Sequence, residues 1–579
     1  MAEKIISPGV FTNEVDQSFL PAGIAAIGAA VIGPTQKGQS GIPTVVSSYS
    51  EYLQKFGGAF TSGSGAVEGS YKYLTNYAAQ EYLKYADTLT VVRIGDGFLP
   101  ATSTVTASGV NANSFTLTTL ADGAEQNSNG TVGTNNLLST GTENNIQYEV
   151  ANVNNAKGTF TLLIRRGDDT INRKTILEQF NNLTLDPNSP NYIARAIGDQ
   201  VYTVRDGGST DPYLQLSGSF VNRSSYVRVS GVRNTLNYLD SNGVRRVESA
   251  TGSLPAAGSG SFSGATNGNL AHPQLFNDKI SNINNQGANM AASTTINTYK
   301  DAIRLLKNQD EYDINMIALP GLIDNFTNHA PVITEALNMV ESRGDCFFIA
   351  DPVEYGASIS TATAKADSRD SNYVAEYWPW IKIPDADLGM NVWVPASTLI
   401  PSVYAFNDRV AAPWFAPAGL NRGALDIAVM TERKLTHANR DTLYDSNVNP
   451  IATFPNAGVV VYGQKTLQKK ASALDRVNVR RLLIAAKKFI ASSTKFLVFE
   501  NNTAVTRNRF LSIVNPYFEN IQQRQGLYAF KVQMDEANNT ADVIDRNEMK
   551  GAIYLQPAKT AEFIIIDFNI LPTGASFPE

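Results

Sequence analysis

The residue types that usually carry chemistry are few in this chain and lie far apart. It has three histidines, His272, His329 and His437, and one cysteine, Cys346. Metal centres and nucleophilic sites need two or more such groups within reach of each other. None of these four has a second histidine or cysteine at ligand spacing. We therefore predict structural or exposed histidines, a buried Cys346, no metal site and no catalytic residue.

The chain also lacks the short motifs that activate a serine or hold a phosphate. The nearest string to a G-x-S-x-G elbow is GSFSG, which has Phe262 at its centre. No Walker lysine loop is present, and no G-x-G-x-x-G follows an expected strand. We expect neither an enzyme nor a cofactor.

Two groups of residues remain as candidate sites. The strings RRGDDT and DSRDSN supply paired acids in loop-like sequence, which we interpret as solvated turns. The string YWPWIKIPD places Tyr377, Trp378 and Trp380 around a proline. These aromatic residues favour a core or subunit contact over a ligand platform, because β-prone sequence continues on both sides.

Composition is that of a soluble multidomain protein. The chain has 579 residues, 17% of them charged, and a net charge of −6. That charge provides no attraction to nucleic acid. The apolar run 23–33 is too short to span a bilayer, which takes about 20 residues. We expect a protein made in a cytoplasm, with no nucleic-acid partner and no membrane insertion.

Two separated stretches alternate strand and helix patterns. Residues 21–98 run from the apolar GIAAIGAAVIG to the β-branched TLTVVRIG. Residues 300–352 hold one β-α-β unit, whose crossover length suits a parallel, right-handed connection. We predict a discontinuous α/β middle domain formed by 21–98 and 300–455.

The sequence between these stretches is β-prone. Residues 99–160 are rich in Thr, Ser, Asn and Gly with alternating apolar positions, and we predict an inserted β-rich surface domain. Residues 161–299 are predicted as a second, largely β-rich insertion, with a mobile Gly/Ser loop near 252–268. The predicted fold class is therefore mixed α/β and multidomain (α+β), with a C-terminal α/β core and β-rich domains inserted in the chain.

Residues 456–579 form the predicted C-terminal core. The string RVNVRRLLIAAKKFIASST reads as a helix with one apolar face. The opposite face carries five basic residues: Arg476, Arg480, Arg481, Lys487 and Lys488. A solvated face or an electrostatic contact with an acidic partner protein would explain them.

Both ends of the chain hold strand-like sequence without an obvious local partner. VFTNEV, residues 10–15, follows Pro8 and Gly9 near the N-terminus. AEFIIIDFNILPTGASFPE closes the chain with a strongly apolar strand and a loose tail. The sequence alone leaves open where these strands pair.

Several segments, in order, resemble the contractile tail sheath proteins of myovirus-type bacteriophages. The similar stretches are SPGVFTNEVDQSFLPAGIAAIGAAVIGPTQKGQSGIPTVVSSYSEYLQKFGG, LEQFNNLTLDPNSPNYIARAIGD, YWPWIKIPD, VPASTLIPSVYAFNDRVAAPWFAPAG, RRLLIAAKKFIASSTKFLVFENNTAVTRNRF and KVQMDEANNTADVIDRNEMKGAIYLQPAKTAEFIIIDFNI. Together they cover more than half of the chain.

The resemblance implies a structural subunit of a virion tail. It would polymerise as stacked six-membered rings around a tail tube and contract to drive the tube through the host envelope. Its partners would be other copies, the tube protein, and baseplate and tail terminator proteins.

The resemblance also implies roles for the chain ends. An N-terminal arm, 1–20, and the C-terminal strand would add to the sheets of neighbouring copies. The expected arm residues are Val10, Phe11, Thr12, Asn13, Glu14 and Val15 at one end and Phe563, Ile564, Ile565, Ile566 and Phe568 at the other. The basic helix face would touch an acidic tube surface.

Other readings remain open at this point. The chain could belong to another contractile injection system, of bacteriocin or secretion type. A carbohydrate-active enzyme or a host-binding adhesin built on the β-rich insertions is less favoured.

Overall fold

The computed structural model describes residues 28–62, 69–108, 112–129, 138–245, 253–270 and 279–562. The expected arm residues 10–15 and the expected strand residues 563–568 lie outside this range, as does His272.

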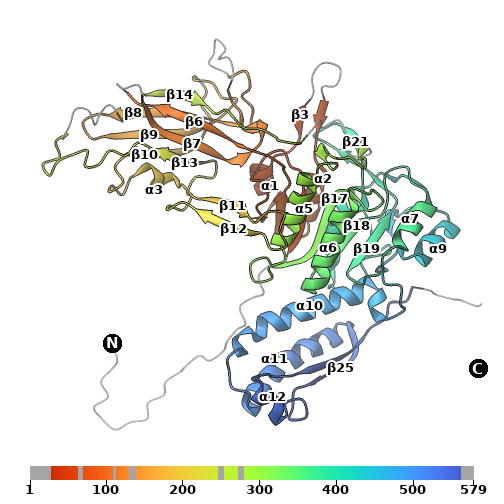
Figure 1. Cartoon of the computed structure of the whole chain (residues 1–579). Helices are drawn as coiled ribbons and strands as arrows, with labels where there is room; N and C mark the ends of the chain where they lie inside the picture. The colour runs from red at the N-terminus through yellow and green to blue at the C-terminus, as the bar shows by residue number, and fades with distance from the viewer. Residues whose placement is uncertain are drawn as a thin grey trace, which may run out of the picture.

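An eight-stranded sheet forms the centre of the molecule, in the order β2-β5-β1-β17-β18-β19-β23-β24 (Figure 1). In chain order the strands are β1 (Gly28–Gly33), β2 (Thr44–Val46), β5 (Leu89–Arg93), β17 (Ile314–Ile323), β18 (Phe347–Asp351), β19 (Val374–Trp378), β23 (Val448–Phe454) and β24 (Gly458–Val461). The inner pairs are parallel and the two edge pairs are antiparallel. Parallel strands are covered on both faces, which explains why β1, β5, β18 and β19 are buried throughout and mostly apolar.

Helices cover both faces of this sheet. On one face lie α2 (Leu74–Tyr82) and α8 (Ile400–Val410), whose side chains join one apolar core. On the other lie α5 (Ser293–Leu305), α6 (Ala330–Arg343), α7 (Ile359–Ala366) and α9 (His437–Asp445). The parallel β17-α6-β18 unit confirms the predicted β-α-β element.

The predicted start of the C-terminal domain at residue 456 falls inside the β23–β24 hairpin. Both strands belong to the central sheet, with Ile451 opposite Val461. The hairpin therefore stays with the middle domain, and the next body begins near residue 477.

The two predicted insertions share a single apolar core. One sheet is β13-β7-β6 and the other is β10-β9-β8-β14. The strands are β6 (Pro100–Thr106), β7 (Asn113–Asp122), β8 (Ile146–Asn154), β9 (Thr159–Arg166), β10 (Ile176–Leu183), β13 (Val227–Val232) and β14 (Gly258–Ser261). Phe115 and Phe160 stack across the sheets at 5.6 Å. Each sheet has one apolar face that the other must cover, so we treat residues 99–270 as one unit, the β insertion.

The stretch expected to be a mobile loop is ordered where it is described. Residues 258–261 form β14 and pair with β8, and Phe262 is fully buried. A Gly/Ser-rich sequence therefore forms an edge strand here, because a neighbouring strand and an aromatic anchor hold it in place.

Arg93 ties the β insertion to the central sheet. This side chain is 1% exposed and donates hydrogen bonds to the backbone carbonyls of Thr35, Gln36, Gly38 and Asp122. Asp122 ends β7, and its carboxylate accepts the Ser40 N–H at 2.9 Å. One guanidinium therefore joins the end of β5, the loop after β1 and the insertion.

Replacing Arg93 by Met should lower the free energy of unfolding by about 3 kcal/mol or more, because several buried carbonyls lose a charged donor. Calorimetry and hydrogen exchange would measure this, with faster exchange expected at residues 35–41 and 120–126. Arg173, exposed on the same unit, gives the control Arg173→Met, which should change stability little. Equal stability of the two variants would contradict the role of Arg93.

A carboxyl group lies inside the central sheet without a partner. Glu376 of β19 is 0% exposed, and within the described residues neither carboxyl oxygen is hydrogen-bonded. The neighbouring Asp324 is already paired with Arg369, with Nε–Oδ2 at 2.5 Å. Burial, and then the charge of Asp324, raise the pKa of Glu376 well above its ordinary value. Burial without a hydrogen-bond partner therefore favours the protonated form of Glu376.

Replacing Glu376 by Gln should stabilise the protein at pH 8. The folded form holds its proton to a higher pH than the unfolded chain, so the stability of the wild type falls as pH rises above about 4.3. Gln does not titrate, so the free energy of unfolding of Glu376→Gln does not fall in this way. Relative to the wild type it should rise by about 1.4 kcal/mol for each pH unit above the unfolded pKa at which the folded Glu376 is still protonated. Melting temperatures at pH 5 and pH 8 measure this. The exposed Glu519 provides the control Glu519→Gln, and an equal difference at both pH values would refute the assignment.

Candidate assembly surfaces

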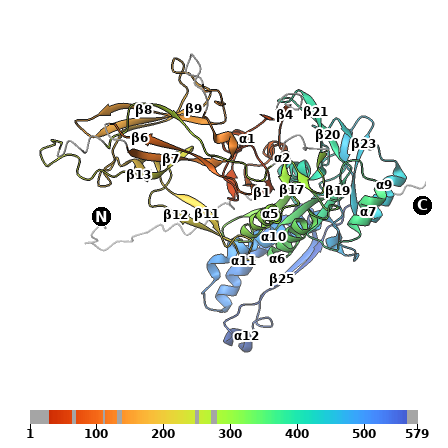
Figure 2. The ribbon, with the colours of Figure 1, turned by 45° about the horizontal axis from the view of Figure 1, so that its top comes forward.

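The C-terminal unit is a small α/β body with its own core. It contains α10 (Val477–Thr494), α11 (Ala504–Gln523), β25 (Leu527–Gln533), α12 (Ala541–Asp545) and β26 (Ala552–Pro557). Phe518 of α11 packs on Phe530 of β25 with ring centres 5.6 Å apart. This unit lies below the central sheet, with α10 between the two bodies (Figure 1), and it remains below the sheet in the turned view of Figure 2.

The apolar side of α10 faces the C-terminal unit. Leu482 and Ala486 are buried in its core, and Phe489 stacks on Tyr517 of α11 with ring centres 3.8 Å apart. These contacts explain the apolar stripe in the sequence.

The basic side of α10 faces the middle domain. Arg480 lies over the Tyr373 ring at 4.1 Å, and burial lowers its pKa. Arg481 lies over the Tyr404 ring at 4.5 Å and donates to Asp408 at 2.5 Å.

The two lysines on this side also contact the middle domain. Lys488 pairs with Asp313, and with Asp345 at 3.3 Å. Lys487 donates to the Gly344 carbonyl at 3.2 Å.

The expectation of a tube-facing basic face therefore needs correction for Arg480, Arg481 and Lys488. The exposed Lys487 stays a prediction. Arg480, Arg481 and Lys488 are only 4–8% exposed, so they are not available to another protein. A basic helix face suggests contact with solvent or a partner only when no other part of the chain covers it. Here the middle domain supplies both the acids and the aromatic rings.

Arg476, the fifth predicted basic residue, holds the chain at its last described position. Its guanidinium binds both carboxylate oxygens of Glu562, at 2.8 and 3.0 Å. Tyr444 donates to the same carboxylate at 2.9 Å, and Gln464 donates to Thr560 at 2.7 Å. We call these contacts the Glu562 clasp; they bring the segment after β26 back to the middle domain.

The C-terminal sheet has open edges. Strands β25 and β26 form a two-stranded antiparallel sheet, and within the described ranges neither has a second partner strand. One face packs on α11, while Tyr528 and Tyr554 are 64% and 58% exposed. Open edges present unpaired backbone groups to which a further strand can add.

The other candidates from the sequence lie in structural positions. Trp378 and Trp380 are buried, and Trp380 donates to the Val353 carbonyl at 3.0 Å, as expected for core aromatics. Asp169 of RRGDDT is buried against Arg165 at 2.5 Å, which corrects the interpretation of a solvated turn. The sequence signal that was missed is this i, i+4 Arg–Asp pair.

The two described histidines and the cysteine lie apart from one another in structural or exposed positions. His329 is buried, accepts the Ile323 N–H at 3.1 Å, and has a pKa lowered by burial to about 4. His437 is exposed beside Asp441, and burial raises the pKa of Cys346 to about 12. Among the described residues no group of three or more His, Cys, Asp or Glu side chains is placed to hold a metal ion. In the same part of the chain no helix has the length and apolarity to cross a bilayer.

Over the residues that the structure describes, the fold is that of a multidomain protein whose C-terminal sheet has open edges suited to association with further strands. Residues 297–467 match the family model of the phage tail sheath protein central domain, and residues 469–570 match that of the phage tail sheath C-terminal domain. These two domain matches confirm the resemblance to phage tail sheath proteins seen in the sequence.

Individual relatives agree with this family. The chain is 41% identical over 210 residues to the tail sheath protein of Vibrio phage KVP40, covering 36% of this chain and 30% of that protein. It is 38% identical over 190 residues to the tail sheath protein of Enterobacteria phage T4, covering 33% and 29%. The matches thus span less than a third of these relatives. The fold is similar to that of a sheath tail protein from Listeria innocua, with a TM-score of 0.51, 11% identity, and coverage of 92% of this chain and 96% of that one.

Replacing Arg481 by Met should cost about 3 kcal/mol, because it removes a buried cation from its carboxylate and aromatic partners. The exposed pair of Lys495 with Asp310, 2.8 Å apart, provides a matched control on the same helical segment. Lys495→Met should cost less than about 1 kcal/mol. Calorimetry of both variants tests this, and similar losses would show that the α10 contacts are no stronger than a surface ion pair.

Proposed function

We propose that this protein is the structural subunit of a contractile phage tail sheath. It polymerises as stacked hexameric rings around a tail tube and contracts to drive the tube through the host envelope. The observation that carries the proposal is the run of two sheath domain matches over residues 297–570, in a fold whose C-terminal sheet has open edges. The role is mechanical rather than enzymatic.

The arms link copies by strand addition. Residues 10–15 and 563–568 of neighbouring copies add to the open edges of β25 and β26. Backbone hydrogen bonds provide the affinity, so the link tolerates a change in the angle between bodies.

Contraction is a change between two packings of the same subunit. The extended lattice is held by barriers, released at the baseplate, and each ring passes the change to the next along the arms. The α10 contacts keep the middle domain and the C-terminal unit together, so the arms take up most of the movement.

Its partners are other copies, the tube protein, and the baseplate and tail terminator proteins, within the virion tail. Contact with the tube comes from the C-terminal unit, through side chains other than the basic set of α10. Arg481 and Lys488 of that set are paired with acids of the same subunit.

Deleting residues 1–16 should leave a folded protein that cannot polymerise. The purified full chain should form long hollow striated tubes in negative-stain electron microscopy, alone or after addition of tube protein. The truncated chain should stay monomeric by light scattering with the same melting temperature. Tubes from the truncated chain would exclude the N-terminal arm as the link. Failure of the full chain to assemble even on tube protein would exclude the sheath role.

A further inference from the structure

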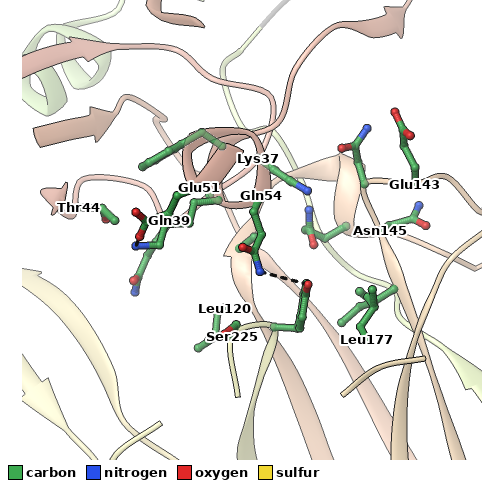
Figure 3. Close-up of a pocket in the computed structure, with 18 residues that line it drawn as sticks. Lys37, Gln39, Thr44, Glu51, Gln54, Leu120, Glu143, Asn145, Leu177 and Ser225 are labelled. Atoms are coloured by element: carbon green, nitrogen blue, oxygen red, sulfur yellow. Dashed lines mark hydrogen bonds and ion pairs between the residues drawn. The ribbon is translucent and has the colours of Figure 1, made fainter. Parts of the chain in front are cut away.

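A cavity lies where the β insertion meets the middle domain (Figure 3). Its volume is about 590 Å³, within the range of cavities that bury small ligands. Lys37 and Gln54 enter it from the middle-domain side, and Glu143, Asn145 and Leu177 of the β insertion face them. One chain supplies the whole lining.

Several polar groups in this cavity lack a partner. Gln126 is 4% exposed, yet its side-chain nitrogen has no hydrogen-bond acceptor within the described residues. The Lys37 ammonium forms neither a hydrogen bond nor an ion pair with any described residue, and burial lowers its pKa. Gln54 reaches only a long contact of 3.4 Å to the Tyr226 hydroxyl. Buried polar groups are normally hydrogen-bonded, so the buried Gln126 nitrogen is the atom that indicates a bound polar molecule. The half-buried Lys37 and the exposed Gln54 are available to the same molecule.

The charges of the lining cancel. Lys55 pairs with Glu51 at 2.8 Å. Lys37 has Glu125 and Glu143 as its nearest opposite charges, and both act to raise its pKa. An ion of either sign would meet a like charge here, so the site suits an uncharged ligand that both donates and accepts hydrogen bonds.

The remaining lining fits vicinal hydroxyl groups on a partly apolar ring. The amides of Gln39, Gln54 and Gln126 each carry a donor and an acceptor, and Leu120 and Leu177 provide apolar contact. Two aromatic side chains, Phe56 and Tyr226, also line the cavity.

We propose that this cavity binds a neutral oligosaccharide. Such binding would give the sheath surface an affinity for cell-surface or environmental glycans. Sugar binding at this cavity requires only one chain, so it can be tested separately from polymerisation.

The test uses the full chain and neutral trisaccharides of glucose, galactose and N-acetylglucosamine, titrated by calorimetry and by saturation-transfer NMR. Gln126→Leu removes the buried unpartnered amide and should not weaken the fold. It should reduce affinity at least tenfold. Gln179→Leu, exposed on β10 outside the cavity, should bind as the wild type does.

Three results would overturn the proposal: no binding of any neutral trisaccharide, equal binding by the Gln126→Leu variant, or binding of sialylated and phosphorylated saccharides only. Capture at this cavity of peptides spanning this chain's own sequence, in place of sugars, would identify it as a contact between copies. Normal tubes with no sugar binding would leave the sheath function intact and remove the glycan site alone.

Discussion

The arrangement of the whole subunit depends on charges buried along one helix. Arg480, Arg481 and Lys488 of α10 are placed between the middle domain and the C-terminal unit, each against an acid or an aromatic ring. A buried cation without its partner is costly, so the two bodies keep one relative orientation. The apolar stripe of the same helix holds α11. One helix thus fixes the position of the open sheet edges relative to the central sheet.

Local sequence patterns predicted the central sheet well and the domain limits poorly. The apolar runs of β1, β17 and β18 and the helix α6 between the latter two are found as expected, because burial on both faces leaves a continuous signal. The shared core of the two insertions could not be predicted from the sequence, because it depends on contacts between distant strands, such as that of Phe115 with Phe160. Residue 456 seemed a boundary because no local pattern reveals a hairpin that completes a sheet.

The sequence predicted which residues form the basic face of α10 but not what that face contacts. The basic face of α10 was visible, but its partners Asp408, Asp313 and Tyr373 are far away in sequence. Arg476 and Glu562 are 86 residues apart in the sequence, so no local sequence pattern predicts that they pair. The cavity beside Lys37 draws on both bodies, so it exists only once they are assembled. The role of the chain ends came from the family resemblance alone and stays a prediction, because both ends lie outside the described residues.

The Glu562 clasp determines how a mechanical load would travel through the subunit. A pull applied beyond residue 562 meets the two-point contact with Arg476 and the Tyr444 hydroxyl before it reaches β26. The tension then passes to the base of α10 and the central sheet, and the two-stranded β25–β26 sheet is spared from being peeled open one hydrogen bond at a time. The small sheet can therefore stay intact as a docking platform while the large sheet bears the force.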